Sequence, residues 1–416
     1  MEDNKNRVKW FTLASIWFGG IVSVPSLLIG STLVASLGFG YTILAGLIGF
    51  CFVVFFMSLL SVAAVEQRKS TVSLAASSFG QQGSKILIGL IIGLSTLGWF
   101  GVQTSIAGES FSNILREAGG FIVPSWISSI FWGIIMVLTA VFGFKYLKWL
   151  NYIAVPAIVL LLTYGVFITL QTHSFSEIFA FEPDSSISLL QAIGFTIGFV
   201  SVGGVISPDY NRFALNKKHA VLGSIAGIIP SALLLLGIGA MLAITQGTFD
   251  IVAIFSTLGF PFLAMSTLIL ATWTSNVINI YSSGLAFTNL GGLAETSRSK
   301  ITLLAGGAGL ILAAIGIMDH FMEFITALTI TITPVAGVII SDYFICRTYK
   351  EVTSKFIWTG ILSWLSGVAI MLFMDSEIKF ILGIIVAAVS YWILKKLTGA
   401  NHINFQQKKI EENEKV

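Results

Sequence analysis

Apolar windows long enough to cross a membrane recur along nearly the whole chain. The hydrocarbon core of a bilayer is crossed by a helix of about 20 apolar residues. Of the 416 residues 55% are hydrophobic and only 10% are charged, which excludes a soluble globular protein. The sequence therefore predicts an all-α integral membrane protein with twelve transmembrane helices, at residues 12–35, 41–65, 86–112, 122–143, 150–170, 188–207, 219–243, 260–281, 301–318, 322–341, 356–373 and 377–395.

Positive charges gather in alternate connecting segments. If the N-terminus is cytoplasmic, all 23 lysines and arginines except Arg116 and Lys379 fall on the cytoplasmic side. Because short loops rich in Lys and Arg stay in the cytoplasm, this asymmetry predicts an even number of spans and two cytoplasmic termini. We expect a multi-pass protein of the cell membrane. The net charge of +3 then reflects topology and indicates no nucleic-acid partner.

The connections between the windows are short, so the sequence predicts one transmembrane domain over residues 1–395. A charged cytoplasmic tail is expected at residues 396–416. The first ten residues are charged and lack the apolar stretch of a cleavable signal peptide, so we expect none. The two cysteines, Cys51 and Cys346, are far apart in this topology and are expected not to pair.

Two windows that are five apart in the order carry glycine and proline at matching positions. The first contains 18-FGGIVSVPS-26 and the sixth contains 198-GFVSVGGVISPD-209. Interrupted helices at corresponding positions of two halves are typical of a transporter binding site, because freed backbone groups there face a cavity. The alternative is that these glycines only allow close helix packing. The pattern predicts discontinuous helices one and six, as the first members of two five-helix repeats.

The third window places an aromatic ring and an amide on one helix face. Trp99 and Gln103 are four residues apart in 94-LSTLGWFGVQTSIAGES-110 and therefore share a face. A flat ring beside a hydrogen-bonding amide suits a small planar ligand. A lone tryptophan can also be a packing or interfacial residue, but Trp99 lies in the middle of its window.

The eighth window, 271-ATWTSNVINIYSSG-284, concentrates neutral oxygen atoms in the membrane. The hydroxyls of Thr274 and Ser275 follow the carbonyl of Ala271 by one turn. Neutral oxygens at this density suit a hard monovalent cation. The alternative is that the hydroxyls bond to carbonyls of their own helix or join neighbouring helices. The interrupted first window supplies further backbone oxygens near Gly19, Val22 and Ser23.

Four motifs in order resemble the nucleobase:cation symporter-1 family, and most closely its cytosine permease branch. They are GWFG in the third window, PDYNRF after the sixth, ATWTSN in the eighth and 333-TPVAGVIISDY-343 closing the tenth. The resemblance extends from about residue 10 to about residue 395. It implies a LeuT-like core of two inverted repeats plus two helices, alternating access around a central site, and cation-driven uptake of a nucleobase or related heterocycle.

The resemblance also implies roles for individual residues. Trp99 matches the aromatic residue on which the substrate stacks, and Phe199 is the ring available as the second wall of a sandwich. Gln103 matches the amide that binds substrate in relatives handling hydantoins and purines. Further implied substrate contacts are Ser201, Gly203, Asn276 and Asn279. The implied sodium residues are Gly19, Val22, Ser23, Ala271, Thr274 and Ser275, with sodium as coupling ion and no other cofactor.

Two departures from the cytosine permease pattern keep the substrate open. Those permeases carry a glutamine where this chain has Thr96, and none at Gln103; their phenylalanine in the sixth span aligns with Val200, one position from Phe199. Cytosine is the first expectation, while hydroxymethylpyrimidine, other pyrimidines, purines, hydantoins and allantoin remain alternatives. Glu109, the one clear ionisable residue within a window, is expected to lie in a solvated outer vestibule, since Ser105, Ser110 and Ser112 are its neighbours. The alternative is that it titrates in a proton-coupled mechanism.

The sequence carries no signature of a membrane-embedded enzyme. It has no H-E-x-x-H or G-x-S-x-G motif and no glycine-rich phosphate loop, so no catalytic residues are expected. A channel would show repeated pore-lining signatures. We therefore expect a monomeric transporter whose partners are a small heterocycle, sodium or a proton, and the lipid bilayer. Asp209 and Asp342, at span ends, are expected to pair with Arg212 and Arg347.

Overall fold

The computed structural model describes residues 7–142, 147–183, 187–257, 260–348 and 354–413, and it is almost entirely helical. Among these residues nine helices are long and apolar enough to cross a membrane, and the bent pair α1 and α2 makes a tenth. The spanning helices are α1 (Trp10–Ile21) with α2 (Val24–Leu37), α3 (Phe39–Gln67), α5 (Gln81–Gly119), α6 (Ser125–Phe142), α7 (Leu147–Thr172), α9 (Leu189–Ile206), α11 (Lys217–Gln246), α13 (Pro261–Leu290), α15 (Phe321–Ile340) and α17 (Lys379–Asn413).

The predicted windows at 301–318 and 356–373 overlap two shorter helices, so each of the twelve windows overlaps a helix of the described residues. These two helices are α14 (Arg298–Ala314) and α16 (Trp358–Phe373). The predicted all-helical membrane fold is confirmed. The short connecting elements are α4 (Thr71–Phe79), α8 (Phe175–Phe179), α10 (Pro208–Asn211), α12 (Ile251–Ser256), the 3₁₀ helix η3 (Glu295–Ser297) and the π-helix η4 (Ser341–Cys346).

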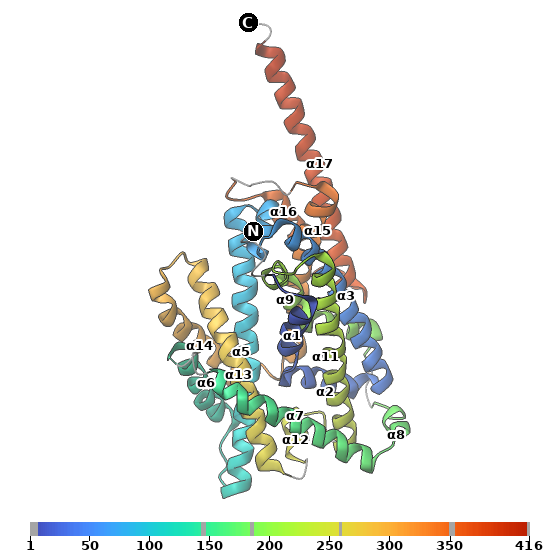
Figure 1. Cartoon of the computed structure of the whole chain (residues 1–416), viewed down its shortest axis with the longest axis vertical. Coiled ribbons are helices and arrows are strands. Elements are labelled where there is room, and N and C mark those ends of the chain that lie inside the picture. Colours follow the sequence, from blue (N-terminus) through green and yellow to red (C-terminus); the bar gives the residue numbers. More distant parts are fainter. Residues whose placement is uncertain (1–6, 143–146, 184–186, 258–259, 349–353, 414–416) are drawn as a thin grey trace.

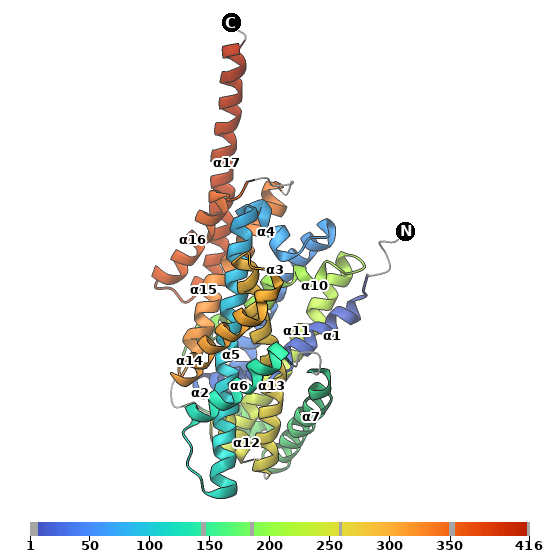
Figure 2. The same cartoon turned by 90° about the vertical axis from the view of Figure 1, so that its left-hand side faces the viewer.

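The helices pack in two groups, and each group contains two neighbouring spans together with the two spans that follow them five places later in the chain. One group joins α1, α2, α3, α9 and α11, which are spans one, two, six and seven. The other joins α5, α6, α13 and α14, which are spans three, four, eight and nine (Figure 1). Such pairing of equivalent spans is what two structural repeats produce. The accessory helices α16 and α17 pack on each other and on α15 (Figure 2).

Span one is broken where the glycine and proline pattern predicts. Helix α1 ends at Ile21 and α2 begins at Val24, with an angle of 62° between them (Figure 1). Ser23 is extended, with φ −152° and ψ 161°, and Pro25 lies in the first turn of α2, where its missing N–H removes no helical bond. The hydroxyl of Ser26 donates a hydrogen bond to the freed carbonyl of Ile21.

Span six differs from the expected interruption at its glycines. Helix α9 runs through Gly203 and Gly204 to Ile206, and Ser207, which separates it from α10, keeps helical angles of φ −53° and ψ −31°. A Cβ on Gly204 would lie 2.7 Å from a ring carbon of Phe56, so this glycine allows α3 to approach. The packing alternative therefore holds for Gly204, and the irregularity is confined to the end of the span.

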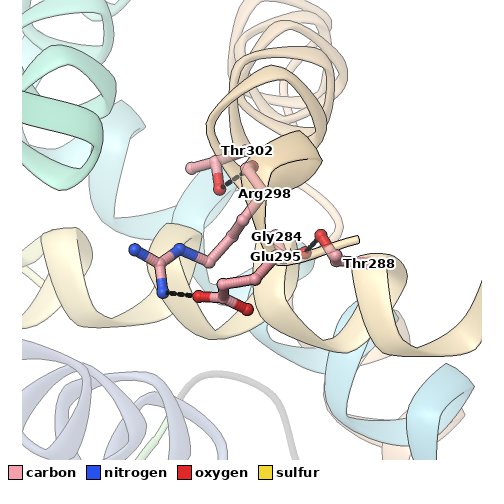
Figure 3. Close-up of polar contacts among 5 residues, drawn as sticks. All are labelled: Gly284, Thr288, Glu295, Arg298 and Thr302. Atoms are coloured by element: carbon pink, nitrogen blue, oxygen red, sulfur yellow. Dashed lines mark hydrogen bonds and ion pairs between the residues drawn. The ribbon is translucent and has the colours of Figure 1, made fainter. Parts of the chain in front are cut away.

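The C-terminal end of α13 (span eight) is held against the start of α14 (span nine) by contacts at the turn between them (Figure 3). Arg298 forms an ion pair with Glu295, and its guanidinium lies 4.9 Å from the centre of the Tyr281 ring. A Cβ on Gly284 would lie 2.8 Å from the Cβ of Thr302, so only glycine permits this approach of the two helices (Figure 3). These contacts hold together the two helices of one group.

The predicted tail continues the last helix. Helix α17 runs from Lys379 to Asn413 and projects beyond the bundle (Figures 1 and 2). Only its part up to Thr398 has the length and hydropathy of a membrane span. Residues 414–416 of the predicted tail lie outside the described residues.

Candidate functional site

A cavity of about 550 Å³ lies at the break of span one, between the two groups of helices. Its walls come from α1, the break after it, α2, α5, α7, α9, α11 and α13. Eleven of the thirteen predicted substrate and cation residues line it. The substrate set contributes Trp99, Gln103, Phe199, Gly203 and Asn279, and the cation set contributes Gly19, Val22, Ser23, Ala271, Thr274 and Ser275.

Trp99 lies in a cluster of aromatic rings at one side of this cavity. The centre of its ring is 5.7 Å from that of Phe199, 5.3 Å from that of Phe324 and 6.1 Å from that of Phe321, all in edge-to-face arrangements. Trp99 and Phe199 are inclined by 84° to each other, so they do not form the parallel walls of the expected sandwich. A planar ligand parallel to the Trp99 ring therefore lies nearly perpendicular to the plane of the Phe199 ring.

Gln103 lies one turn beyond Trp99 on α5, as predicted, and connects to span eight. The hydroxyl of Ser275 donates a hydrogen bond to its Oε1 atom. Gln103 is only 4% exposed, and it lines the cavity. A residue of the predicted substrate set and one of the predicted cation set are thus in direct contact.

The predicted cation residues bring neutral oxygens from the break of span one and from α13 to the same cavity. On α13, Thr274 Oγ1 donates to the Ala271 carbonyl at 2.9 Å, and Ser275 Oγ lies 3.2 Å from the same carbonyl. These are the hydroxyl-to-carbonyl bonds within one helix that we gave as the alternative to a cation site. They still leave lone pairs on the carbonyl and hydroxyl oxygens available to a cation. Carbonyl and hydroxyl oxygens without a buried formal charge fit a monovalent cation. No cluster of three His, Cys, Asp or Glu residues suited to a metal occurs in the described ranges.

Two predicted substrate contacts, Ser201 and Asn276, are turned away from the cavity. Ser201 is fully buried and donates to the Gly198 carbonyl at 2.9 Å, because the cavity face of α9 is the one that Phe199 and Gly203 share. Asn276 Nδ2 donates to the carbonyl of Phe100 at 3.0 Å and to Thr104 Oγ1 at 2.9 Å. Asn276 therefore joins α13 to α5. Neither Ser201 nor Asn276 lines the central cavity, and their contact with substrate stays a prediction.

With this geometry established, comparison with known proteins decides the family. The family model described as a permease for cytosine/purines, uracil, thiamine and allantoin matches residues 1–393. The chain belongs to this permease family. The predicted resemblance is thereby confirmed, and so is the expectation of a transporter in place of an enzyme.

Sequence relatives of the permease include two bacterial proteins. It is 30% identical over 365 residues to the cytosine permease of Escherichia coli strain K12, covering 86% of this chain and 82% of that one. It is 25% identical over 426 residues to the hydantoin permease of Microbacterium maritypicum, covering 92% of this chain and 86% of that one. The family shared with these proteins is a multi-pass membrane family.

Solved structures share the fold of the permease. The inward-facing conformation of Mhp1 matches with a TM-score of 0.81 at 22% identity, over 94% of this chain and 92% of that chain. Mhp1 in a closed conformation with bromovinylhydantoin bound, described as a nucleobase-cation-symport-1 family transporter, matches with a TM-score of 0.76 at 21% identity, over 94% of both chains. The LeuT-like arrangement of the helices is therefore confirmed.

Sequence reasoning missed Trp17, a cavity residue of the permease that is held by a buried polar network. Its indole N–H donates to Asn211 Oδ1 at 3.0 Å, and Asn211 Nδ2 donates to Ser61 at 2.7 Å and to Ser224 at 2.9 Å. The position of Trp17, two residues before the glycine pair, was the available signal. The other residues not predicted are Gly20, Ile21, Pro25, Asn151, Ala154, Val155, Ile158, Val200, Val202, Ile228 and Ile278.

Glu109 of the permease lies in a second cavity of about 590 Å³. Asp250, Asp319 and Ser105 line the same space. Phe321 lines this cavity too, and its ring contacts Trp99. Aromatic side chains therefore lie between Glu109 and the central cavity.

The predicted ion pairs at Asp209 and Asp342 are replaced by other contacts. Asp209 Oδ1 accepts the backbone N–H of Thr71 at 2.9 Å, at the start of α4. Asp342 accepts hydrogen bonds from the hydroxyls of Ser77 at 2.5 Å and Tyr391 at 2.9 Å. In the described part of the chain neither carboxylate is within ion-pair distance of its predicted arginine. The carboxylates still anchor connecting segments, but through N–H and O–H donors.

Proposed function

We propose that this permease imports a nucleobase or a closely related heterocycle together with a cation, with cytosine the first candidate substrate and sodium the first candidate ion. The observation that carries this proposal is a single cavity bordered by an aromatic ring, an amide and a set of neutral oxygens. Trp99 and Gln103 supply the first two, and Ala271, Thr274 and Ser275 supply oxygens beside them.

A planar heterocycle matches the chemistry of the cavity wall. Offset or edge-on contact with an aromatic ring contributes roughly 0.5–1.5 kcal/mol beyond the burial of apolar area. A buried amide left without its partner costs about 1–3 kcal/mol, so Gln103 discriminates strongly between ring substituents. Cytosine is proposed first because a cytosine permease is 30% identical over most of the chain.

Gln103 itself favours a second group of candidate substrates. It borders the cavity one turn from Trp99, where the family resemblance places the amide of hydantoin- and purine-handling relatives. Hydantoins, allantoin, purines and hydroxymethylpyrimidine therefore form the alternative to cytosine. A relative named hydantoin permease, 25% identical over 92% of this chain, supports including them.

Sodium is favoured over a proton by the position of the available groups. The central cavity is bordered by neutral carbonyl and hydroxyl oxygens, whereas Glu109 lies in the second cavity beyond the aromatic rings. One positive charge moving inward across 100 mV gains about 2.3 kcal/mol. That energy corresponds to roughly fifty-fold accumulation, so one coupled cation suffices for scavenging.

We further propose that the two groups of helices move relative to each other during transport. Trp99, Gln103 and Ser275 belong to the group of α5 and α13, whereas Phe199 and Val22 belong to the group of α1 and α9. A ligand held between them is exposed to one side or the other when the groups change their relative position. We assign both termini to the cytoplasm of a cell-membrane protein, from the distribution of Lys and Arg.

Uptake of radiolabelled cytosine by cells lacking their own cytosine permease tests this function. We expect sodium-dependent uptake by cells expressing the chain, measured in sodium chloride against choline chloride. Competition with unlabelled hydantoin, allantoin, adenine and hydroxymethylpyrimidine then ranks the alternatives. Failure to take up labelled cytosine, hydantoin, allantoin or adenine would refute the proposed function.

A further inference from the structure

The contact between Ser275 and Gln103 leaves one end of the Gln103 amide facing the cavity. Ser275 donates its hydroxyl proton to Gln103 Oε1. Within the described residues Gln103 Nε2 donates no hydrogen bond to the protein, and the residue borders the cavity. In this arrangement the amide therefore offers N–H donors to a ligand.

The proton of Ser275 has a competing acceptor on its own helix. Ser275 Oγ lies 3.2 Å from the Ala271 carbonyl and 3.3 Å from the Thr272 carbonyl. A hydroxyl has one proton, so donation to Ala271 leaves Ser275 able only to accept from Gln103. The amide must then turn its Nε2 toward Ser275 and its Oε1 toward the cavity. The direction of one hydroxyl proton thus decides which end of Gln103 a ligand meets.

We propose that a cation bound by the Ala271 carbonyl and the Ser275 hydroxyl locks Gln103 with its N–H donors toward the ligand. A cation at these oxygens repels the Ser275 proton, so donation to Ala271 is lost. The Gln103 oxygen, the closest of the three acceptors, then receives the proton. This inference rests on the proposed cation site and assigns it a second task, the orientation of the amide that recognises the substrate.

The chemical class of the substrate follows from this orientation. With the cation bound, the site accepts a planar heterocycle that presents a ring carbonyl to Gln103 while it lies against Trp99. Without the cation, the amide oxygen can face the same carbonyl, and two acceptors repel each other. Since binding linkage is reciprocal, a carbonyl ligand strengthens cation binding by the same factor as the cation strengthens ligand binding.

A comparison of Ser275 with Thr274 tests the inference, because both supply a hydroxyl to the candidate cation site and only Ser275 contacts Gln103. The full chain, purified in lipid nanodiscs, is titrated with tritiated cytosine in saturating sodium chloride and in choline chloride. The ratio of the two dissociation constants measures the linkage, expected at about 5- to 150-fold for the unaltered chain. We expect Thr274→Ala to keep this ratio, Ser275→Ala to reduce it to about one, and Ser275→Thr to restore it.

Saturation by sodium is established for each variant with ²²Na⁺, since both alanine variants lose a candidate ligand. The far-UV circular dichroism spectrum and the thermal unfolding transition of Ser275→Ala, compared with those of the unaltered chain, show whether this variant is folded. A ratio for Ser275→Ala equal to that of Thr274→Ala would overturn the inference. Equal cytosine binding by the unaltered chain in both salts would also overturn it, while leaving the substrate assignment intact. An unaltered chain that binds neither cytosine nor hydantoin would refute the proposed function, and the inference with it.

Discussion

The rings of Trp99 and Phe199 meet edge to face across the two groups of helices, with 5.7 Å between their centres and 84° between their planes. Trp99 belongs to α5 and Phe199 to α9, which lie in different groups. A ligand in contact with both rings is therefore held by both groups at once. Under the proposed movement of one group against the other this contact changes, which would link binding to transport at these two side chains.

Trp99→Ala is expected to weaken cytosine binding at least about tenfold. The substitution removes an aromatic contact of roughly 0.5–1.5 kcal/mol together with the burial of ligand area. Trp99→Phe keeps a ring and should retain part of the affinity. Trp358, an exposed residue of α16, provides the matched control Trp358→Ala. Equilibrium binding of labelled cytosine measures the effect, and equal loss in both alanine variants would speak against the site.

Thr274→Ala is expected to raise the sodium concentration needed for half-maximal uptake, with the maximal rate at saturating sodium retained. The substitution removes one neutral oxygen from the candidate cation site and leaves Trp99 and Gln103 in place. Thr272→Ala is the control, because that hydroxyl is buried and donates to the Leu268 carbonyl at 2.8 Å, away from the cavity. A sodium dependence that is the same in all three proteins would remove Thr274 from the site.

Asn211→Ala is expected to lower the free energy of unfolding by about 1–3 kcal/mol. The substitution leaves the indole N–H of Trp17 without its acceptor and removes the donor to Ser61 and Ser224. Thermal unfolding in detergent, followed by tryptophan fluorescence, measures the change. Asn216→Ala removes an amide from an exposed N-cap and should shift the transition less. An unchanged transition in Asn211→Ala would show that this network does not stabilise the permease.

Gly198→Ala is expected to destabilise the contact between α9 and α15. A Cβ there would lie 2.5 Å from the Ile325 carbonyl oxygen, a backbone atom that cannot move aside alone. Overpacking of this kind typically costs about 1–3 kcal/mol. Gly307→Ala is the matched control, since a Cβ at that position meets nothing within 4 Å. Thermal unfolding of the two variants should separate them, and equal transitions would contradict the packing at Gly198.

Glu109→Gln is expected to leave the dependence of uptake on sodium and on pH unchanged. Glu109 lies in the second cavity, separated from the central one by the contact of Phe321 with Trp99. Uptake measured between pH 5.5 and pH 8 in sodium chloride and in choline chloride checks this expectation. Loss of a pH-dependent component in Glu109→Gln would instead favour proton coupling.

The presence of Trp99 and Gln103 on one face of span three was predictable, because residues four apart in a helix share a face. The break of span one was predictable as well, since the glycine pair and Pro25 are local signals. Such signals depend only on residues close in sequence.

Spacing did not predict which side chains of α13 face the cavity, because polar residues occur on more than one face of this helix. Asn276 was placed with the substrate contacts but reaches Phe100 and Thr104 on α5. Gly204 was predicted to be part of an interruption, but it lies in a continuous helix, where its lack of a side chain makes room for the ring of Phe56. Trp17 escaped prediction because Asn211, its polar partner, is 194 positions away. These three differences share one cause, since each depends on contacts between spans that are distant in sequence.

Reconstitution provides the most direct test that the Trp99 cavity carries a heterocycle together with sodium. Purified protein in liposomes, with sodium outside and choline inside, is expected to accumulate labelled cytosine above its external concentration. The same liposomes with Trp99→Ala should fail to do so, and those with Trp358→Ala should behave as the unaltered protein. Equal accumulation with and without the sodium gradient, or undiminished accumulation by Trp99→Ala, would contradict this account.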